Sequence, residues 1–158
     1  MLSAFNLAVK GKKGNLFSVE CMFQASKVFE KGGPYTDLLY VSSYEAKKDA
    51  RLKNSGKIIG FNFNGRQFPC EPKTLFYNWL YINTLVFNKN LAQEVLAYDA
   101  FTDIEFNPKK SLNCQAEAVA IYVALKRQGL LDVALRNQQS FYNVVFGKEK
   151  EGDLFAGL

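Results

Sequence analysis

The sequence predicts an α+β fold, a single mostly helical domain with a small antiparallel β-sheet. The chain has 158 residues, of which 48% are hydrophobic and 15% aromatic, which is enough to build the core of one domain. Apolar residues recur at helical spacing over several long segments, and Asn64-Gly65 between two alternating segments is a strong hairpin signal. We expect the domain to span residues 1–147 and a polar tail to follow at 148–158.

The first elements should be extended. Residues 5–9 are apolar, the turn-forming residues 10–15 follow, and apolar character resumes at Leu16 and Phe17. This pattern is typical of a hairpin or of two short extended pieces. Ser18 is then a suitable N-cap for a helix, with Glu20 in the first turn, where a carboxylate interacts favourably with the helix dipole.

The helix that begins after Ser18 is expected to continue through Phe29 and to end at the Lys-Gly-Gly-Pro sequence of residues 31–34. At about 100° per residue, Glu20, Gln24 and Lys27 would share an arc of roughly 60° on a helix that is otherwise apolar. An acid, an amide and an amine on one arc could line a cleft and perform acid/base or covalent chemistry. The alternative is that they form the solvated stripe of a core helix.

The middle of the chain reads as helices on either side of one hairpin. Pro34 suits the first position of a second helix that reaches Tyr40, and Ser42 or Ser43 caps a third. Trp79 falls among helical core positions. The elements expected after residue 40 are a helix at 44–53 that ends at 54–56, strands at 57–63 and 66–69, and helical spacing over 74–97 with a break at 88–90.

Residues 98–114 differ in kind, because they are polar, contain aromatic residues and have no sustained period. Such a segment is either a binding loop or a partly ordered connector. Helices are expected to follow at 115–128, ended by Gly129, and at 130–146.

Composition limits the chemistry. The chain has no histidine, which excludes an imidazole base, and its three cysteines, Cys21, Cys70 and Cys114, are too far apart to suggest a disulfide framework or a zinc site. The net charge of +5 is compatible with a phosphate-bearing ligand or nucleic acid. With neither a long apolar segment nor a signal-peptide pattern at the N-terminus, the chain is expected to be cytoplasmic.

The segment Ser-Val-Glu-Cys-Met-Phe-Gln-Ala-Ser-Lys at 18–27 resembles the signature of the NADAR family, a Ser-Glu-His-Tyr-Phe-Gln-Ala-x-Lys type motif. A charged helix beginning with Ser-Ser at residue 42 and an Asp-containing loop with a downstream Asn at 99–113 occur in the family's order. Gly-Gly-Pro-Tyr-Thr-Asp at 32–37 and the segment at 98–111 resemble the branch associated with DarT-type toxins, which ADP-ribosylate guanine in DNA.

The resemblance assigns roles to matching positions. Glu20 corresponds to the signature acid, Gln24 to its amide and Lys27 to its lysine, whereas the family's histidine after the acid is Cys21 here. Asp103 corresponds most nearly to a loop aspartate and Asn113 to a downstream asparagine. We therefore expect Glu20, Lys27 and Asp103 to be catalytic. The ligand is expected to be bound by Gln24, Tyr35, Asp99, Phe101, Asn107, Lys109, Lys110 and Asn113. Of these, the lysines are chosen because they suit phosphates and the aromatic residues because they could stack on a base, although the aromatic residues could instead belong to the core.

Antitoxins of this branch are N-glycosidases that remove ADP-ribose from guanine. The resemblance thus implies a hydrolase that needs no cofactor, with ADP-ribosylated DNA as substrate, ADP-ribose as ligand or product, and a cognate DarT-type toxin as a candidate partner. Two alternatives remain open, namely a non-catalytic module that binds ADP-ribose and an N-glycosidase for a small ribosylated metabolite.

Overall fold

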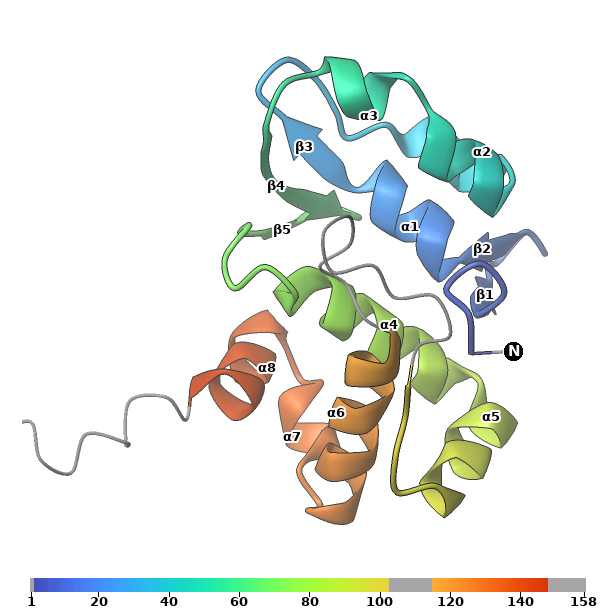
Figure 1. Ribbon diagram of the computed structural model, residues 1–158, viewed down its shortest axis with the longest axis vertical. Helices are drawn as coiled ribbons and strands as arrows, with labels where there is room; N and C mark the ends of the chain where they lie inside the picture. The colour runs from blue at the N-terminus through green and yellow to red at the C-terminus, as the bar shows by residue number, and fades with distance from the viewer. Residues whose placement is uncertain (1, 103–114, 148–158) are drawn as a thin grey trace, which may run out of the picture.

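The computed structural model describes residues 2–102 and 115–147, and within them it confirms the α+β class (Figure 1). Two small antiparallel sheets, rather than one, accompany the helices. The predicted loop residues Asp103, Asn107, Lys109, Lys110 and Asn113, and the tail at 148–158, lie outside the described residues. The elements are β1 (Ala8–Lys10), β2 (Leu16–Ser18), α1 (Val19–Ala25), β3 (Lys27–Phe29), η1 (Thr36–Tyr40), α2 (Ser43–Lys48), α3 (Arg51–Asn54), β4 (Ile58–Phe63), β5 (Arg66–Phe68), α4 (Leu75–Phe87), α5 (Lys89–Glu94), η2 (Val95–Ala97), α6 (Gln115–Arg127), α7 (Leu131–Ala134) and α8 (Gln138–Val145).

The N-terminal hairpin leads directly into α1, as predicted. Strands β1 and β2 pair antiparallel, with Val9 opposite Phe17. Ser18 is the N-cap of α1, and its hydroxyl accepts a hydrogen bond from the Cys21 amide at 3.1 Å. The helix lies between α2 and η1 on one side and α4 on the other (Figure 1).

The prediction that this helix continues to residue 29 is wrong. Helix α1 ends at Ala25, and the Ser26 hydroxyl donates to the Met22 carbonyl at 2.7 Å. The Ser26 carbonyl instead accepts from the amide of Asn62 at 2.7 Å, which ties the end of the helix to β4. Lys27 therefore begins strand β3, in which the strand-favouring residues Val28 and Phe29 follow it.

Strand β3 completes a three-stranded antiparallel sheet in the order β3-β4-β5. Lys27 lies opposite Phe61 of β4. The β4–β5 hairpin was predicted correctly, and Asn64 and Gly65 both have the positive φ that its turn requires, at 50° and 81°. The Gly-Gly-Pro segment reverses the chain after β3, where the Phe29 amide donates to the Gly32 carbonyl at 2.8 Å.

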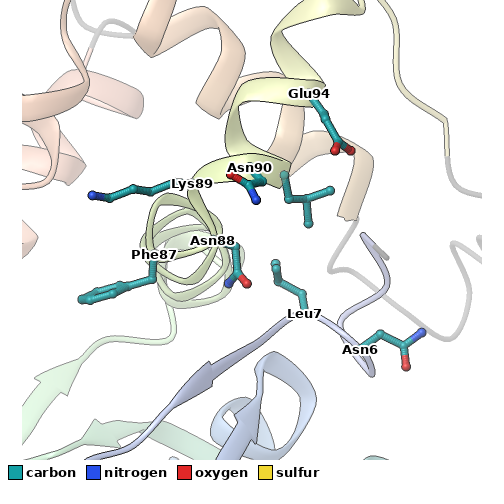
Figure 2. Close-up of a pocket in the computed structure, with 8 residues that line it drawn as sticks. Asn6, Leu7, Phe87, Asn88, Lys89, Asn90 and Glu94 are labelled. Carbon is teal, nitrogen blue, oxygen red and sulfur yellow. The ribbon is translucent and has the colours of Figure 1, made fainter.

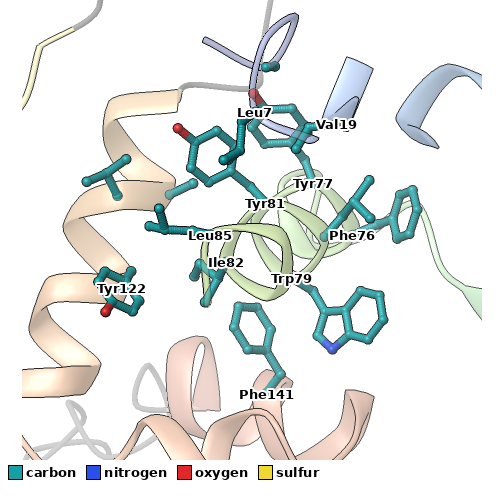
Figure 3. Packing of buried hydrophobic residues seen from close by; sticks show 14 of the residues in the cluster. Leu7, Val19, Phe76, Tyr77, Trp79, Tyr81, Ile82, Leu85, Tyr122 and Phe141 are labelled. Carbon is teal, nitrogen blue, oxygen red and sulfur yellow. The ribbon is translucent and has the colours of Figure 1, made fainter. Parts of the chain in front are cut away.

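Helix α4 is the centre of the main core, and apolar side chains surround it on all sides (Figure 3). Trp79 is buried there, as expected. The predicted break is confirmed at Asn88, whose side-chain amide donates to the carbonyls of Ala8 at 2.9 Å and Thr84 at 2.8 Å. Helix α6 is confirmed within one residue of the predicted C-terminal end.

Three predicted helices are shorter or interrupted. The segment after Pro34 is a 3₁₀ helix that begins at Thr36, so Pro34 is not its first residue. Asp49 divides the third helix into α2 and α3, because its carboxylate accepts from the Arg51 amide at 2.9 Å and begins a new turn. Asn137 divides the last helix in the same way by capping the Ser140 amide at 2.8 Å.

Gly33 is expected to be indispensable to the turn after β3. Its φ is +82°, and a Cβ there would lie 2.3 Å from the Lys27 carbonyl oxygen. Gly65 is a matched control, because its φ is +81° but a Cβ would meet nothing within 4 Å. We expect Gly65→Ala to cost about 1 kcal/mol and Gly33→Ala about 3 kcal/mol or more in denaturant unfolding. Equal losses would show that the close approach to Lys27 is unimportant.

Candidate active site

Glu20 and Gln24 form a buried polar pair on α1. Each is 7% exposed, and the Gln24 side-chain nitrogen donates to Glu20 Oε1 at 2.8 Å. The first turn that carries Glu20 is fixed by the Ser18 cap and by the Glu20 amide, which donates to the Ala4 carbonyl at 2.9 Å. Gln24 Oε1 is buried and has no hydrogen-bond partner within the described part of the chain. A ligand that donates a hydrogen bond to this oxygen would satisfy it.

Lys27 approaches this pair from β3 rather than from α1. Its side chain is half-buried, and its amine lies 4.9 Å from the centroid of the Phe23 ring. Burial lowers the pKa of Lys27 from 10.5 to about 8, although the negative charge of Glu20 opposes this shift. At neutral pH, a substantially larger fraction of this amine is therefore uncharged and nucleophilic than in an exposed lysine.

Phe23 holds the amine on a rigid platform. Its ring contacts Tyr77 edge-to-face at 5.3 Å, Phe61 at 5.4 Å and Phe76 at 6.0 Å between centroids. Because these rings belong to the main core, Phe23 has little freedom to move away from Lys27.

Lys47 is a second cation at this site. It lies on α2 with its amine 5.1 Å from the centroid of the Phe5 ring. Its positive charge contributes to lowering the pKa of Lys27, so the two amines are electrostatically coupled. The sequence placed Lys47 only on a generally basic helix, and it offered no signal that Phe5 would lie beside it.

Cys21 lies on a different face of α1 from Glu20. It is buried with Ala25, Leu38 and Ala46 in a second apolar cluster, and its thiol donates to the Val41 carbonyl at 3.4 Å. The departure from the family signature at this position is therefore a change in packing.

Tyr35 has contacts that fix the loop after β3. The Arg51 guanidinium lies 4.5 Å from the Tyr35 ring centroid, Phe29 packs on the ring at 6.1 Å, and the hydroxyl forms a hydrogen bond with Ser55. Arg51 is held in turn by Asp37 at 2.6 Å. These contacts anchor the segment that packs on the Lys27 backbone.

Asp99 and Phe101 contact other parts of the molecule. Asp99 is exposed and forms an ion pair at 2.8 Å with Arg127, in the last turn of α6. Phe101 packs against the main core and meets Tyr98 edge-to-face at 6.5 Å. Neither residue has a described contact with Glu20, Gln24 or Lys27.

A polar cluster that the sequence did not suggest joins α4 to α6. Glu117 Oε1 accepts from the Asn78 side-chain nitrogen at 2.9 Å and from the Thr74 hydroxyl at 3.2 Å. The signal that the sequence did offer was Asn78, an amide among the apolar residues in the first half of α4, and the structure buries it fully.

Three cavities lined by described residues lie elsewhere. One of about 540 Å³ separates the N-terminal segment at Asn6 and Leu7 from the α4–α5 junction (Figure 2). A second of about 600 Å³ lies on the β3–β5 sheet, and a third of about 350 Å³ is bordered by Trp79 and Phe63. None of the three includes Glu20, Gln24 or Lys27, so the arrangement of charges, rather than cavity size, identifies the candidate site.

Residues 2–102 and 115–147 contain no cluster of three or more acidic or cysteine side chains suited to a metal ion. Within the same ranges, no helix has the length and apolar character needed to cross a membrane.

Lys27→Met should stabilise the folded chain at neutral pH. In the parent, the pKa of Lys27 is about 8 in the folded chain and 10.5 in the unfolded chain, so the unfolded chain binds the proton more tightly. The free energy of unfolding of the parent therefore rises with pH between these two values, whereas that of Lys27→Met lacks this contribution. We expect a gain on the order of 1–3 kcal/mol at pH 7 that shrinks by pH 10, measured by thermal unfolding. Lys53→Met, at an exposed position, is the control. A lower midpoint for Lys27→Met at pH 7 would contradict this account.

The comparison with known families agrees with the resemblance carried by residues 18–27. A family model described as DarT1-associated NADAR antitoxin matches residues 1–153. No curated protein sequence matches the chain significantly. Since the family match covers nearly the whole chain, this protein belongs to the family of DarT1-associated NADAR antitoxins.

Proposed function

We propose that this protein is an N-glycosidase that removes ADP-ribose from guanine bases in DNA and so reverses the action of a DarT-type toxin. The observation that supports this most directly is the Lys27 amine, with a pKa of about 8, beside the buried Glu20. Family membership supports an antitoxin role. The combination of a neutral amine with a carboxylate suits covalent catalysis at a sugar carbon.

In the proposed mechanism, Lys27 is the nucleophile. The ribose opens as its ring oxygen takes up a proton from solvent, which leaves an iminium group between the anomeric carbon and the guanine nitrogen. The lone pair of the Lys27 amine forms a bond to that carbon. The bond to guanine then breaks, guanine leaves with a proton on its nitrogen, and a lysine Schiff base remains. Water adds to the same carbon and displaces Lys27, which releases ADP-ribose.

Glu20 would transfer the proton that moves from Lys27 to guanine. It would accept one from Lys27 as the new bond forms and return one to the departing guanine nitrogen. While ionised, it would also stabilise positive charge on the anomeric carbon. Gln24 holds one Glu20 oxygen and leaves its own carbonyl oxygen for a ligand donor.

The rest of the ligand would extend away from this pair. Lys47 is suited to a phosphate of the substrate because its amine lies near Lys27 on an exposed helix. Asp103 stays a proposed catalytic residue, and the proposed binding residues include Tyr35, Asp99, Phe101, Asn107, Lys109, Lys110 and Asn113. We propose ADP-ribosylated DNA as substrate, ADP-ribose as product, a cognate DarT-type toxin as the biological counterpart, and a cytoplasmic location.

Loss of the Lys27 amine should abolish turnover. We expect Lys27→Ala to release ADP-ribose from ADP-ribosyl-guanine DNA at least 1,000-fold more slowly than the parent, and Glu20→Gln about 100-fold more slowly, in a single-turnover assay. Lys126→Ala, at an exposed position on α6, is the control and should retain full activity. Binding of ADP-ribose should survive in Lys27→Ala. Full activity of that variant would disprove the mechanism, and binding without release by the parent would favour the non-catalytic module.

Replacing Glu20 and replacing Lys47 should shift the pH dependence of the reaction rate in opposite directions. Because attack needs the neutral amine, the single-turnover rate should rise with pH and level off above about 8. Glu20 raises the pKa of Lys27, so the residual rate of Glu20→Gln should rise at lower pH. Lys47 lowers that pKa, so Lys47→Gln should shift the rise to higher pH. Shifts in the same direction would contradict the assignment of Lys27 as the titrating group.

A further inference from the structure

Exposed aromatic side chains gather where η1 meets α2. Tyr40 is 69% exposed and Tyr44 is 59% exposed, and they lie four residues apart on either side of the α2 cap. Tyr40 contacts Phe17 of β2 edge-to-face at 5.7 Å, which places it beside the N-terminal hairpin. Large aromatic rings left in water at adjacent positions mark a surface for an apolar or stacking partner.

The same surface is bordered by lysines. The hairpin turn carries Lys12 and Lys13, and residues 2–19 contain no acidic residue. This turn packs on Phe17, since a Cβ on Gly11 would lie 2.6 Å from the Phe17 ring. At the other end, the Lys48 amine lies 4.0 Å from the Tyr44 ring centroid.

Glu45, the acidic residue of α2, does not neutralise the lysines at the C-terminal end of that helix. Glu45 directs its carboxylate to Ser42, accepting from the amide at 2.9 Å and from the hydroxyl at 2.7 Å. Its negative charge is thus held at the N-terminus of α2, whereas Lys47 and Lys48 occupy the last turn. Lys47 in turn acts electrostatically on Lys27. Helix α2 thus carries positive charge within electrostatic reach of the candidate active site.

We propose that the hairpin turn, Tyr40 and Tyr44 bind the single-stranded DNA that flanks the guanine held at Lys27. Aromatic rings that stack on bases, with lysines that contact the phosphates, are the means by which proteins bind single strands without sequence preference. A guanine in a duplex would have to leave the base stack to reach a half-buried amine, so a single-stranded flank suits the site. The link to Lys27 rests on the proposed function, whereas strand binding by this surface does not.

The direct test is the binding of an unmodified, fluorescein-labelled single-stranded oligonucleotide, followed by anisotropy. We expect Tyr40→Ala and Tyr44→Ala each to weaken binding about tenfold. Tyr142→Ala, a partly exposed tyrosine on α8, is the matched control and should bind like the parent. Thermal unfolding of each variant shows whether it has folded.

The lysines make a separate prediction for the same assay. Replacing both Lys12 and Lys13 by Gln should reduce the slope of log affinity against log salt by about 1.4, because each phosphate contact on a single strand releases about 0.7 of a counterion. Lys126→Gln, on α6, should leave the slope unchanged. If the aromatic and lysine variants all bind the strand like the parent, the inference is wrong and the surface is left for another partner, such as a protein.

Activity measurements separate this inference from the proposed function. On an ADP-ribosylated oligonucleotide, Tyr40→Ala and Tyr44→Ala should raise KM about tenfold, and on ADP-ribosyl-guanosine they should leave it unchanged. Release of ADP-ribose with unaltered KM on both substrates would overturn the inference and leave the function intact. If the parent released ADP-ribose from neither substrate, the proposed glycosidase function would be wrong. Weaker binding of the unmodified strand by the tyrosine variants would still support the proposed strand-binding surface.

Discussion

The desolvation of the Lys27 amine is the constraint on which the rest of the site depends. It arises because the chain leaves the helical path at Ser26, whose carbonyl accepts from Asn62 of β4 instead of continuing α1. Had the helix continued, Glu20 and Lys27 would stand about 10 Å apart along one axis. With Lys27 on a strand, the amine instead returns over Phe23, and the charge of Glu20 reaches it. The burial that lowers the pKa of Lys27 also costs folding free energy, which the aromatic core around Phe23 offsets.

Local signals predicted most of the elements, and the failures have two causes, namely long-range strand pairing and side-chain capping inside a helical pattern. Ser18 and Asn64-Gly65 act through their own backbone or nearest neighbours, so their roles were correct from sequence alone. Residues 26–29 are too short a segment for hydrophobic periodicity to distinguish a strand from a helix. What decides is pairing with β4, whose residues lie about thirty positions later. The breaks at Asp49 and Asn137 were missed because side-chain capping there competes with an otherwise helical pattern.

The part of the candidate site that depends on local spacing was predictable, and the part that depends on long-range packing was not. Glu20 and Gln24 lie on one helix four residues apart, so their contact follows from helical spacing. The approach of Lys47 and Phe5 depends on how α2 and the N-terminal segment pack against α1, which no local pattern reports. Asp99 was predicted to bind the ligand because it lies in a polar segment, yet it forms its ion pair with Arg127 in the last turn of α6.

The signature motif can be understood as three faces of one short helix. Val19, Met22 and Phe23 enter the main core, Cys21 and Ala25 enter the second cluster, and Glu20 and Gln24 occupy the arc between them. Because Phe23 borders the polar arc, the amine that lies on its ring must also lie near the acid. Gly33 constrains Lys27 from outside the helix, because the absence of a Cβ lets the turn after β3 pack against the Lys27 carbonyl. A change at Cys21 is therefore expected to alter packing, whereas a change at Gly33 would displace the backbone that carries Lys27.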